Sequence, residues 1–427
     1  MSRGLILSAP GSGSGKTTVT LGVLRALSNR GQPVRGAKSG PDYIDPRFHA
    51  AACGQPCPNL DAWAMSPGRV RDLAAGTGLL MIEGAMGLFD GAPPKGRGAT
   101  ADLARILQLP VILVVDCARM AHSIAPLIAG FANFDPAVKV AGVILNHVGS
   151  PRHETMLRAA LAPSGLPVIG ALRRLGKIEQ PSRHLGLVQA EEHVDLDAYL
   201  DEVAGHVEAH LDLDLLCSLA SEMTPADAAP KLVPPAQRIA VAQDRAFAFA
   251  YPHILADWRG AGAEVSFFSP LANEAPEKTD FIFLPGGYPE LHAGHLAANT
   301  RFLNALREAA ETTMIYGECG GYMLLGDGLE DAQGVRHAMA GLLPLETSFA
   351  RRKLHLGYRH IQCRSGPFKG RWNAHEFHYA STLRAEGEPL FKAQDAEGND
   401  LADMGLQQGK TCGSFAHLID QATNIAE

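Results

Sequence analysis

The segment Gly317-Glu318-Cys319-Gly320-Gly321 could present a nucleophilic thiol. It follows the apolar run Thr313-Met314-Ile315 and precedes Tyr322-Met323-Leu324-Leu325, so we predict a strand, a sharp turn and a helix. Glycines beside a nucleophile allow the close backbone approach that such a turn requires, and a helix N-terminus lowers a thiol pKa. The pattern therefore favours a reactive cysteine over a buried structural one.

A cysteine nucleophile needs a general base and donors for a developing oxyanion. His417 is the favoured base, although the residues alone barely separate it from His375 and His378. The pair His375 and His378 is not a zinc HExxH motif, because the second histidine comes one residue too soon. Leu284-Pro285-Gly286-Gly287-Tyr288-Pro289-Glu290 ends a predicted strand, and we expect the backbone N–H groups of Gly287 and Tyr288 to face the oxyanion.

A second set of residues near the N-terminus is typical of a phosphate-binding loop. Ser8-Ala9-Pro10 leads into a Gly/Ser-rich run and Lys16-Thr17-Thr18, between a predicted strand and a predicted helix. Such a loop turns backbone N–H groups onto phosphate oxygens, and the helix dipole adds positive potential. Pro10 stands where the strict motif has glycine, but other glycines supply the flexibility. The predicted ATP-binding residues are Gly11, Ser12, Gly13, Ser14, Gly15, Lys16, Thr17 and Thr18.

Four acids lie in segments that belong beside such a loop, namely Asp42, Asp45, Glu83 and Asp90. Magnesium takes hard oxygen ligands and usually only one or two carboxylates besides phosphates. We therefore expect Thr17, Asp45 and Glu83 to bind Mg²⁺, and the four acids together to divide metal binding and acceptor positioning among them. For each acid taken alone, an ordinary solvated loop is the alternative. Asp116 also ends a predicted strand, and its role is open.

The elements around these residues predict two α/β domains, because 427 residues exceed the usual size of one hydrophobic core. Continuous apolar strands that alternate with helices in the first half indicate a parallel sheet covered on both faces. A helical tail over 195–221 is expected to close this domain. We predict an N-terminal domain over residues 1–222, a Pro-rich linker over 223–236, and a C-terminal domain over 237–427. The expected strands are 4–9, 79–83, 111–116, 140–146, 167–172, 238–242, 263–268 and 281–284, and the expected helices include 16–29, 101–107, 124–132, 154–161 and 251–260.

Composition argues against several classes of function. The net charge of -7 gives no basic field for nucleic acid, and no apolar run is long enough to cross a bilayer. Seven scattered cysteines fit free thiols in a reducing cytoplasm, and the N-terminus shows no cleavable signal. Cys53 and Cys57 have no second pair at zinc-like spacing. A homodimer is the default expectation for such a fold.

Together, these motifs in this order resemble the cobyrinic and hydrogenobyrinic acid a,c-diamide synthases of cobalamin biosynthesis, over essentially the whole chain. The similarity also rests on the acidic segments around Asp42 and Glu83 and on His375-Glu376-Phe377-His378-Tyr379. It implies a dethiobiotin-synthetase-like P-loop domain followed by a class I glutamine amidotransferase domain. It also implies that Cys319 is the nucleophile and His417 its base. Many class I enzymes carry an acid two residues after that histidine, where this chain has Ile419.

The resemblance implies a mechanism in which ATP with Mg²⁺ phosphorylates an acetate carboxylate of the macrocycle. Cys319 would form a glutamyl thioester and release ammonia from L-glutamine, and the ammonia would displace phosphate at the a and c positions. The acceptor would be hydrogenobyrinic or cobalt-containing cobyrinic acid, and the Ala-, Arg- and Gly-rich composition favours the cobalt-free acid. One alternative is a cobyric acid synthase. The other is a P-loop switch ATPase, and that function would leave the cysteine turn unexplained.

Overall fold

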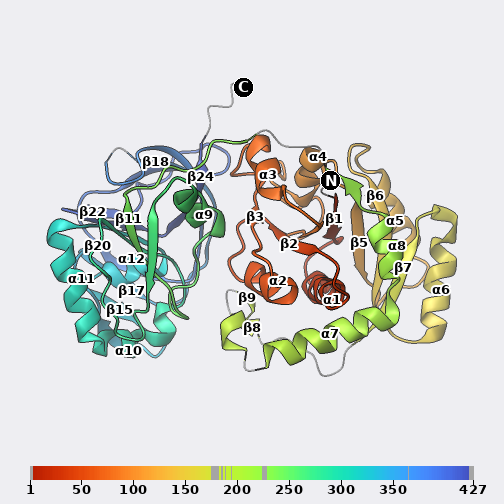
Figure 1. Ribbon diagram of the computed structural model, residues 1–427, viewed down its shortest axis with the longest axis horizontal. Coiled ribbons are helices and arrows are strands. Elements are labelled where there is room, and N and C mark those ends of the chain that lie inside the picture. The colour runs from red at the N-terminus through yellow and green to blue at the C-terminus, as the bar shows by residue number, and fades with distance from the viewer. Residues whose placement is uncertain are drawn as a thin grey trace. The chain divides into compact units, whose positions relative to one another are not determined.

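The computed structural model describes residues 3–174, 182–183, 186–187, 189–193, 195–223, 228–363 and 365–422. Contacts divide the chain into two compact units, Met1–Ala229 and Pro230–Glu427, whose elements are labelled in Figure 1. The boundary between the units falls within the Pro-rich segment predicted as a linker, of which residues 224–227 lie outside the described residues. Each unit is described by itself.

The first unit is built on a mainly parallel sheet with strand order β3-β2-β4-β1-β5-β6-β7. A short strand, β10 (Ser221–Glu222), pairs antiparallel with β1. Strand β1 is central in this order, and the predicted phosphate loop follows its carboxyl end. In this architecture, ligands bind outside the carboxyl ends of the strands. The other strands are β1 (Arg3–Ser8), β2 (Val34–Ser39), β3 (Asn59–Leu60), β4 (Leu79–Glu83), β5 (Val111–Asp116), β6 (Val140–Val148) and β7 (Val168–Arg173).

Helix α1 (Lys16–Asn29) begins directly after the phosphate loop and packs on β1, β2 and β4 and also against α7 (Leu196–His210). Figure 1 shows α7 next to α1. The two helices approach closely at Gly22, where an added methyl group would lie 2.5 Å from Val207. The other helices of this unit are α2 (Asp45–Cys53), α3 (Pro67–Ala74), α4 (Thr100–Leu107), α5 (Ile124–Asn133), α6 (Pro151–Leu161) and α8 (Leu213–Ser218).

The helical tail expected over 195–221 is wrong as one continuous element. Leu211 has extended backbone angles and ends α7. The side chain of Asp212 then accepts a hydrogen bond from the Leu215 N–H and caps the separate helix α8, as short polar side chains do at helix N-termini. Strand β2 was also missed, because Arg35, Gly36 and Lys38 interrupt its apolar pattern.

The second unit contains a sheet with strand order β12-β11-β13-β14-β23-β22. All neighbouring pairs in it are parallel except that of β22 with β23. Its helices are α9 (Pro252–Gly260), α10 (Ala293–Ala298), α11 (Thr300–Thr312) and α12 (Gly320–Leu325). The strands are β11 (Arg238–Ala242), β12 (Glu264–Phe268), β13 (Phe281–Leu284), β14 (Met314–Glu318), β22 (Leu406–Gln408) and β23 (Thr411–Ser414).

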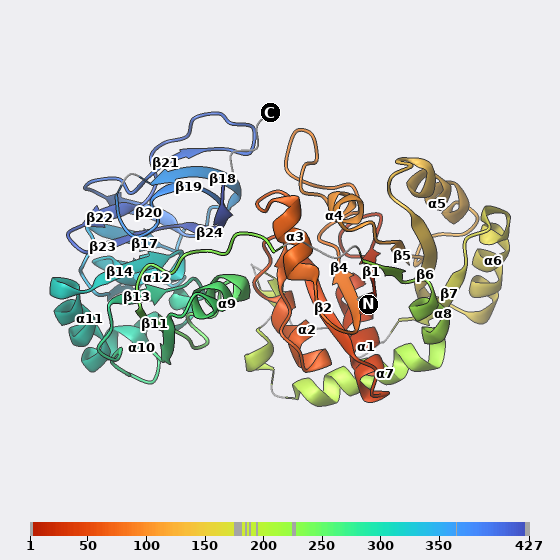
Figure 2. The same cartoon turned by 45° about the horizontal axis from the view of Figure 1, so that its top comes forward.

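After β23, the chain leaves this sheet and enters a four-stranded antiparallel sheet as β24 (Ala416–Gln421). Figure 2 shows β23, β24 and the neighbouring strands of this unit. The order of the second sheet is β21-β18-β19-β24, with β18 (His355–Cys363), β19 (Gly370–His378) and β21 (Phe391–Gln394). This crossing brings His417 beside the end of β14. A further sheet joins β15 (Gly328–Glu330), β16 (Arg336–Ala338), β17 (Leu345–Ser348) and β20 (Ser381–Ala385).

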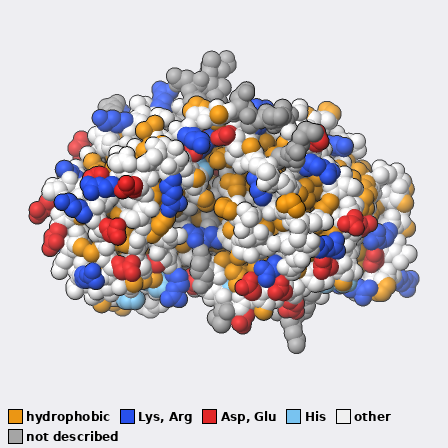
Figure 3. All heavy atoms as spheres, in the orientation of Figure 1, with side chains coloured by type: hydrophobic (Ala, Val, Ile, Leu, Met, Phe, Trp, Pro, Cys, Tyr) orange, Lys and Arg blue, Asp and Glu red, His pale blue; other side chains and the backbone are white. Residues whose placement is uncertain are grey.

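Basic and acidic side chains are interspersed over the face of each unit that Figure 3 shows. Among the described residues, no helix combines the length and the apolar composition that a membrane span requires. All seven cysteines are free thiols.

Candidate active sites

The loop between β1 and α1 has the backbone shape that its glycines permit. Gly13 and Gly15 adopt φ values of 77° and 79°, a left-handed region that side-chain-bearing residues rarely occupy. A methyl group at Gly15 would lie 2.2 Å from Nδ2 of Asn146, and that amide donates a hydrogen bond of 2.9 Å to the carbonyl of Ser14. The end of β6 therefore fixes the loop from one side.

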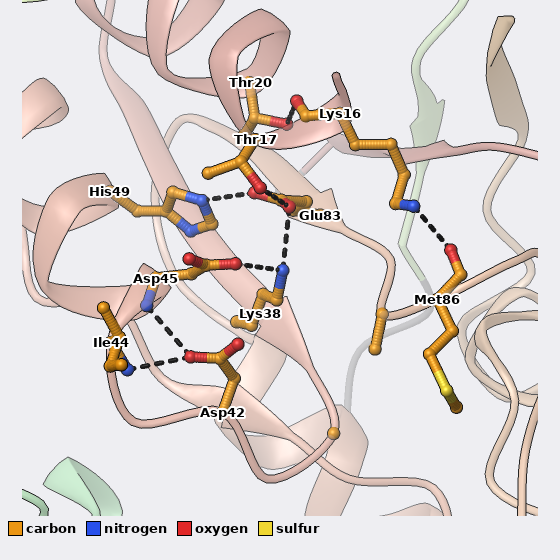
Figure 4. Close-up of polar contacts among 12 residues, drawn as sticks. Lys16, Thr17, Thr20, Lys38, Asp42, Ile44, Asp45, His49, Glu83 and Met86 are labelled. Atoms are coloured by element: carbon orange, nitrogen blue, oxygen red, sulfur yellow. Dashed lines mark hydrogen bonds and ion pairs between the residues drawn. The ribbon is translucent and has the colours of Figure 1, made fainter. Parts of the chain in front are cut away.

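Glu83, at the carboxyl end of β4, is the centre of a buried polar cluster shown in Figure 4. Its Oε1 accepts hydrogen bonds of 2.7 Å from both the Thr17 hydroxyl and the Lys38 ammonium. Its Oε2 lies 2.6 Å from Nε2 of His49. Burial alone would raise the pKa of this carboxyl, but Lys38 and His49 outweigh that effect and lower it. Glu83 is therefore ionised beside the first turn of α1.

Lys38 also joins Asp45 to this cluster, because its Nζ lies 2.6 Å from Oδ2 of Asp45. Burial would lower the pKa of Lys38, but Asp45 and Glu83 reverse the effect and raise it. Burial and repulsion from Asp42 raise the pKa of Asp45 to about 6. A single buried cation thus neutralises part of the charge of two carboxylates.

The other two predicted acids make local backbone contacts. Oδ1 of Asp42 accepts hydrogen bonds from the N–H groups of Ile44 and Asp45 at the start of α2, and Oδ2 of Asp90 accepts one from the Gly87 N–H. Both acids hold the turns in which they lie. The structure thus joins Thr17 to Glu83 directly and Asp45 to Glu83 through Lys38, and Asp42 is connected to Asp45 at the start of α2.

Lys16 donates a hydrogen bond of 2.5 Å to the carbonyl of Met86, as Figure 4 shows. Met86 has a φ of 48°, which is uncommon for a residue with a side chain. Burial lowers the pKa of Lys16, although Glu83 acts in the opposite direction.

The role of Asp116 was open. Its Oδ1 lies 3.0 Å from Nδ1 of His147, and the two residues lie near the carboxyl ends of the neighbouring strands β5 and β6.

In the second unit, Cys319 occupies the predicted sharp turn between β14 and α12. Its backbone has a φ of 45° and a ψ of -102°, a strained conformation of the kind found where strain is stored at functional sites. Space requires the two glycines that follow Cys319. A methyl group at Gly321 would lie 2.0 Å from the Leu284 carbonyl oxygen, and one at Gly320 would lie 3.0 Å from the backbone nitrogen of Gly287.

The helix N-terminus was expected to lower the pKa of the Cys319 thiol, but the net shift in this structure has the opposite direction. Cys319 is buried, and burial, with the charge of Glu290 adding to it, raises the pKa of the thiol well above its ordinary value. The Gly320 N–H acts in the favourable direction but is too weak. The thiol is therefore protonated at rest and needs a base to become nucleophilic.

His417 lies where such a base is needed. An added methyl group at Gly286 would lie 2.3 Å and 2.9 Å from Cε1 and Nε2 of His417 and 3.3 Å from Cβ of Cys319. The Nε2 edge of the ring and the nucleophile therefore border the same small space. His417 is fully buried, and Oε2 of Glu318 lies 3.5 Å from its Nδ1.

The loop predicted to stabilise the oxyanion borders the same turn. The backbone nitrogen of Gly287 lies next to Gly320, and the carbonyl of Pro285 accepts a hydrogen bond of 3.0 Å from the Gly321 N–H. The ring of Tyr288 is buried and packs edge-on against Phe249.

The alternative bases occupy neighbouring positions. His375 lies opposite His417 in the register of β19 and β24, and burial lowers its pKa to about 3. His378 stacks on Phe415 and bonds through Nε2 to Oε1 of Glu376. Side chains of His355, Glu376 and His378 come close enough to bind a metal. Arg359 also binds the other oxygen of Glu376 at 2.7 Å, so in this structure the cluster is an ion-pair network.

Sequence reasoning missed four residues in these sites, Lys38, His49, Asn146 and Glu318. Lys38 could have been noticed, because a lysine that ends a strand directly before the Asp42 segment is costly to bury without acids. The other three have partners in distant segments. For example, Asn146 and Ser14 are separated by 132 positions, so no local pattern marks them.

The comparisons with known proteins match both units. Residues 5–188 match the model of a CobQ/CobB/MinD/ParA nucleotide binding domain. Residues 238–425 match that of a CobB/CobQ-like glutamine amidotransferase domain. Hydrogenobyrinate a,c-diamide synthases are similar over 98% of this chain. Those of Brucella suis and Rhodobacter capsulatus are 56% and 52% identical, with 98% of each relative covered, and that of Rhizobium meliloti is 54% identical, with 99% covered.

The chain is a glutamine-dependent amidotransferase ligase, and it belongs to the hydrogenobyrinate a,c-diamide synthase family.

Proposed function

We propose that this protein uses ATP and L-glutamine to amidate the a and c acetate carboxylates of hydrogenobyrinic acid, through acyl phosphate intermediates. The relatives that are similar over almost the whole chain are named hydrogenobyrinate a,c-diamide synthases. The observation that carries the proposal for this chain is the pairing of two sites: a phosphate loop with a buried acid cluster in one unit, and a strained, buried cysteine beside a histidine in the other.

The first site suits the activation of a carboxylate. The glycine-rich loop and the start of α1 would bind the ATP phosphates, and Lys16 would leave Met86 to contact them. Attack of the acetate oxygen on the γ-phosphorus breaks the bond to the β–γ bridging oxygen and releases ADP. The product, an acyl phosphate, has a far better leaving group than the acid.

The donor set of this site also fits Mg²⁺, because it consists of hard oxygens that this ion prefers. The hydroxyl of Thr17 and a carboxylate oxygen of Glu83 are 2.7 Å apart, and Asp45 reaches the same lysine as Glu83. We propose that Thr17, Glu83 and Asp45 would hold the ion. When bound, Mg²⁺ would neutralise phosphate charge, and Lys38 would limit the repulsion between the two carboxylates.

The second site suits the release of ammonia from glutamine. His417 would take the proton of the Cys319 thiol, and the sulfur would attack the side-chain amide carbon. The backbone N–H groups of Gly287 and Tyr288 would donate to the resulting oxyanion. His417 would return the proton to the leaving nitrogen as the C–N bond breaks, which leaves a glutamyl thioester. Water would then release glutamate, and ammonia would displace phosphate from the activated carboxylate.

The test is the mass of the product after incubation with ATP, Mg²⁺ and glutamine, with hydrogenobyrinic acid and cobyrinic acid supplied in parallel. We expect two amidations of hydrogenobyrinic acid. The Cys319→Ala variant should lose this reaction with glutamine and keep it with ammonium. Amidation of cobyrinic acid alone would assign the cobalt-containing acceptor instead. Amidation of neither acid, with ATP still hydrolysed, would contradict the proposal and favour a switch ATPase.

A further inference from the structure

Glu318, the residue before the nucleophile, is buried against the histidine of the candidate glutaminase site. Its Oε2 lies 3.5 Å from Nδ1 of His417. Its Oε1 accepts a hydrogen bond of 3.1 Å from the backbone N–H of Leu418, the residue after that histidine. Both carboxylate oxygens of Glu318 thus point at β24. The exposed fraction of the Glu318 residue is 2%, so no solvent competes for these oxygens.

The fold holds this arrangement from two directions. Strands β14 and β23 are parallel neighbours, with Glu318 opposite Ser414 in their register, and the Cys319 N–H donates a hydrogen bond of 2.8 Å to the Ser414 carbonyl. The chain then turns into β24 within three residues, which brings His417 back to the end of β14. The pairing of β14 with β23, and the short turn from β23 into β24, therefore bring the nucleophile, the histidine and the carboxylate together.

The two edges of the His417 ring face different partners. The Nε2 edge borders the space that Cys319 also borders, and the Nδ1 edge faces Glu318. An ionised carboxylate only accepts hydrogen bonds, so this contact favours the tautomer with its proton on Nδ1. That tautomer carries no proton on Nε2, so Nε2 can accept the thiol proton.

We propose that Glu318 is the positioning carboxylate of the glutaminase site, which orients His417 and stabilises the imidazolium that forms when Cys319 is deprotonated. The inference rests on the proposed Cys319–His417 chemistry. It supplies the acid that is missing two residues after His417, where the chain has Ile419. A distance of 3.5 Å is longer than a good hydrogen bond, and such contacts often shorten only when substrate is bound.

Other titratable groups face the same region. Tyr316 lies on β14, and its pKa is raised well above the ordinary value by burial and by the charge of Glu318. His375 on β19 lies opposite His417. Besides burial, the charges of Glu290, Glu376 and Glu318 itself all raise the pKa of the Cys319 thiol. Glu318 faces the Nδ1 edge of the His417 ring at 3.5 Å.

The decisive variant is Glu318→Gln, which preserves the shape and removes the charge. Its amide has only one acceptor oxygen. If that oxygen keeps the Leu418 N–H, the amide nitrogen faces Nδ1 of His417 and disfavours the productive tautomer. We expect kcat for glutamine hydrolysis to fall by about 10²-fold with KM within about twofold, compared with roughly 10⁴-fold for the buried acid of a serine protease triad. Glu318→Asp keeps the charge at a longer distance and should restore part of kcat.

Asp257→Asn is the matched control. Asp257 is another buried carboxylate of this unit that accepts a backbone N–H, from Leu232, and its variant should keep kcat within about twofold. Full kcat in Glu318→Gln would overturn the inference, and so would equal losses in Glu318→Gln, Glu318→Asp and Asp257→Asn, because these would indicate a structural role. If Glu318→Gln does not fold, an unchanged kcat in Glu318→Asp overturns it. Absence of glutaminase activity in the unaltered protein would instead overturn the proposed function itself.

Discussion

Nζ of Lys38 lies 2.7 Å from Oε1 of Glu83, and both side chains are almost fully buried. Replacement of one partner of a buried pair leaves an uncompensated charge, which costs far more than the pair contributes. Lys38 comes from β2 and Glu83 from β4, two neighbouring strands of the sheet. The pair therefore ties the position of the acid cluster to the order of the strands beside the phosphate loop.

The Glu83→Gln variant should lose carboxylate activation and keep glutamine hydrolysis. The neutral amide cannot balance the positive charge of Lys38. Its nitrogen must also face one of the groups that now contact the Glu83 carboxylate oxygens. With ammonium as the nitrogen source, we expect ATP-dependent amidation to fall by about 10² to 10³-fold, the usual loss when one electrostatic contact of a reacting site is removed. Glutaminase activity should stay within about twofold. Glu154→Gln, a surface variant of α6, is the control, and normal amidation by Glu83→Gln would contradict the assignment.

The Lys38→Met variant should destabilise the first unit. Two buried carboxylates, Asp45 and Glu83, lose their shared cation, so the free energy of unfolding should fall by about 3 to 5 kcal/mol. The measurement is urea unfolding, followed by hydrogen exchange of peptides that span β1 and β4. Lys139→Met removes an exposed lysine and should change this free energy by less than about 0.5 kcal/mol. Similar small effects of both variants would show that the Lys38 pair does not stabilise this unit.

The sequence allowed prediction of the features that depend on neighbouring residues. The phosphate loop, most strands of both main sheets and the turn at Cys319 follow from glycine spacing and apolar runs that a short window contains. The helix over 16–29 and the strands over 79–83, 111–116, 238–242 and 281–284 agree with the structure at both ends. The Lys16-Thr17-Thr18 run fixed the start of α1 because a phosphate loop must lead into a helix.

The contacts that could not be predicted from the sequence depend on which strands become neighbours. Lys38 bonds Glu83 only because β2 lies beside β4, and Glu318 reaches His417 only because β23 lies beside β14. The state of the Cys319 thiol was misjudged for a related reason. The local helix end favours a thiolate, but the burial that opposes it comes from segments across the whole unit.

The Gly286→Ala variant should disable glutamine hydrolysis without affecting the use of ammonium. The added methyl group would lie 2.3 Å from Cε1 of His417, a distance that real Cβ atoms do not show, so the buried ring must move away from Cys319. A misplacement of about 1 Å at a reacting group can cost about 10²-fold in rate, and we expect at least this loss in glutaminase kcat. Gly294→Ala in α10 meets its nearest atom at 3.4 Å and should retain activity. Full glutaminase activity in Gly286→Ala would contradict the placement of His417.

The His375→Gln variant should make the second unit less sensitive to acid. Burial lowers the pKa of His375 from 6.5 to about 3, so below pH 6.5 the unfolded chain binds a proton that the folded chain does not. Stability is therefore lost as the pH falls from 6.5 towards 3, at up to about 1.4 kcal/mol per pH unit. The pKa of the neighbouring Glu376 is lowered from 4.5 to about 2 because His378 and Arg359 outweigh its burial. The stability that Glu376 contributes is lost only below pH 4.5.

Between pH 6.5 and 5, the decline in the free energy of unfolding due to His375 should thus amount to roughly 2 kcal/mol and should be absent from the variant. Urea unfolding at both pH values, followed by hydrogen exchange of peptides that span β19, measures this difference, and equal slopes for the two proteins would show that His375 takes up a proton in the folded state.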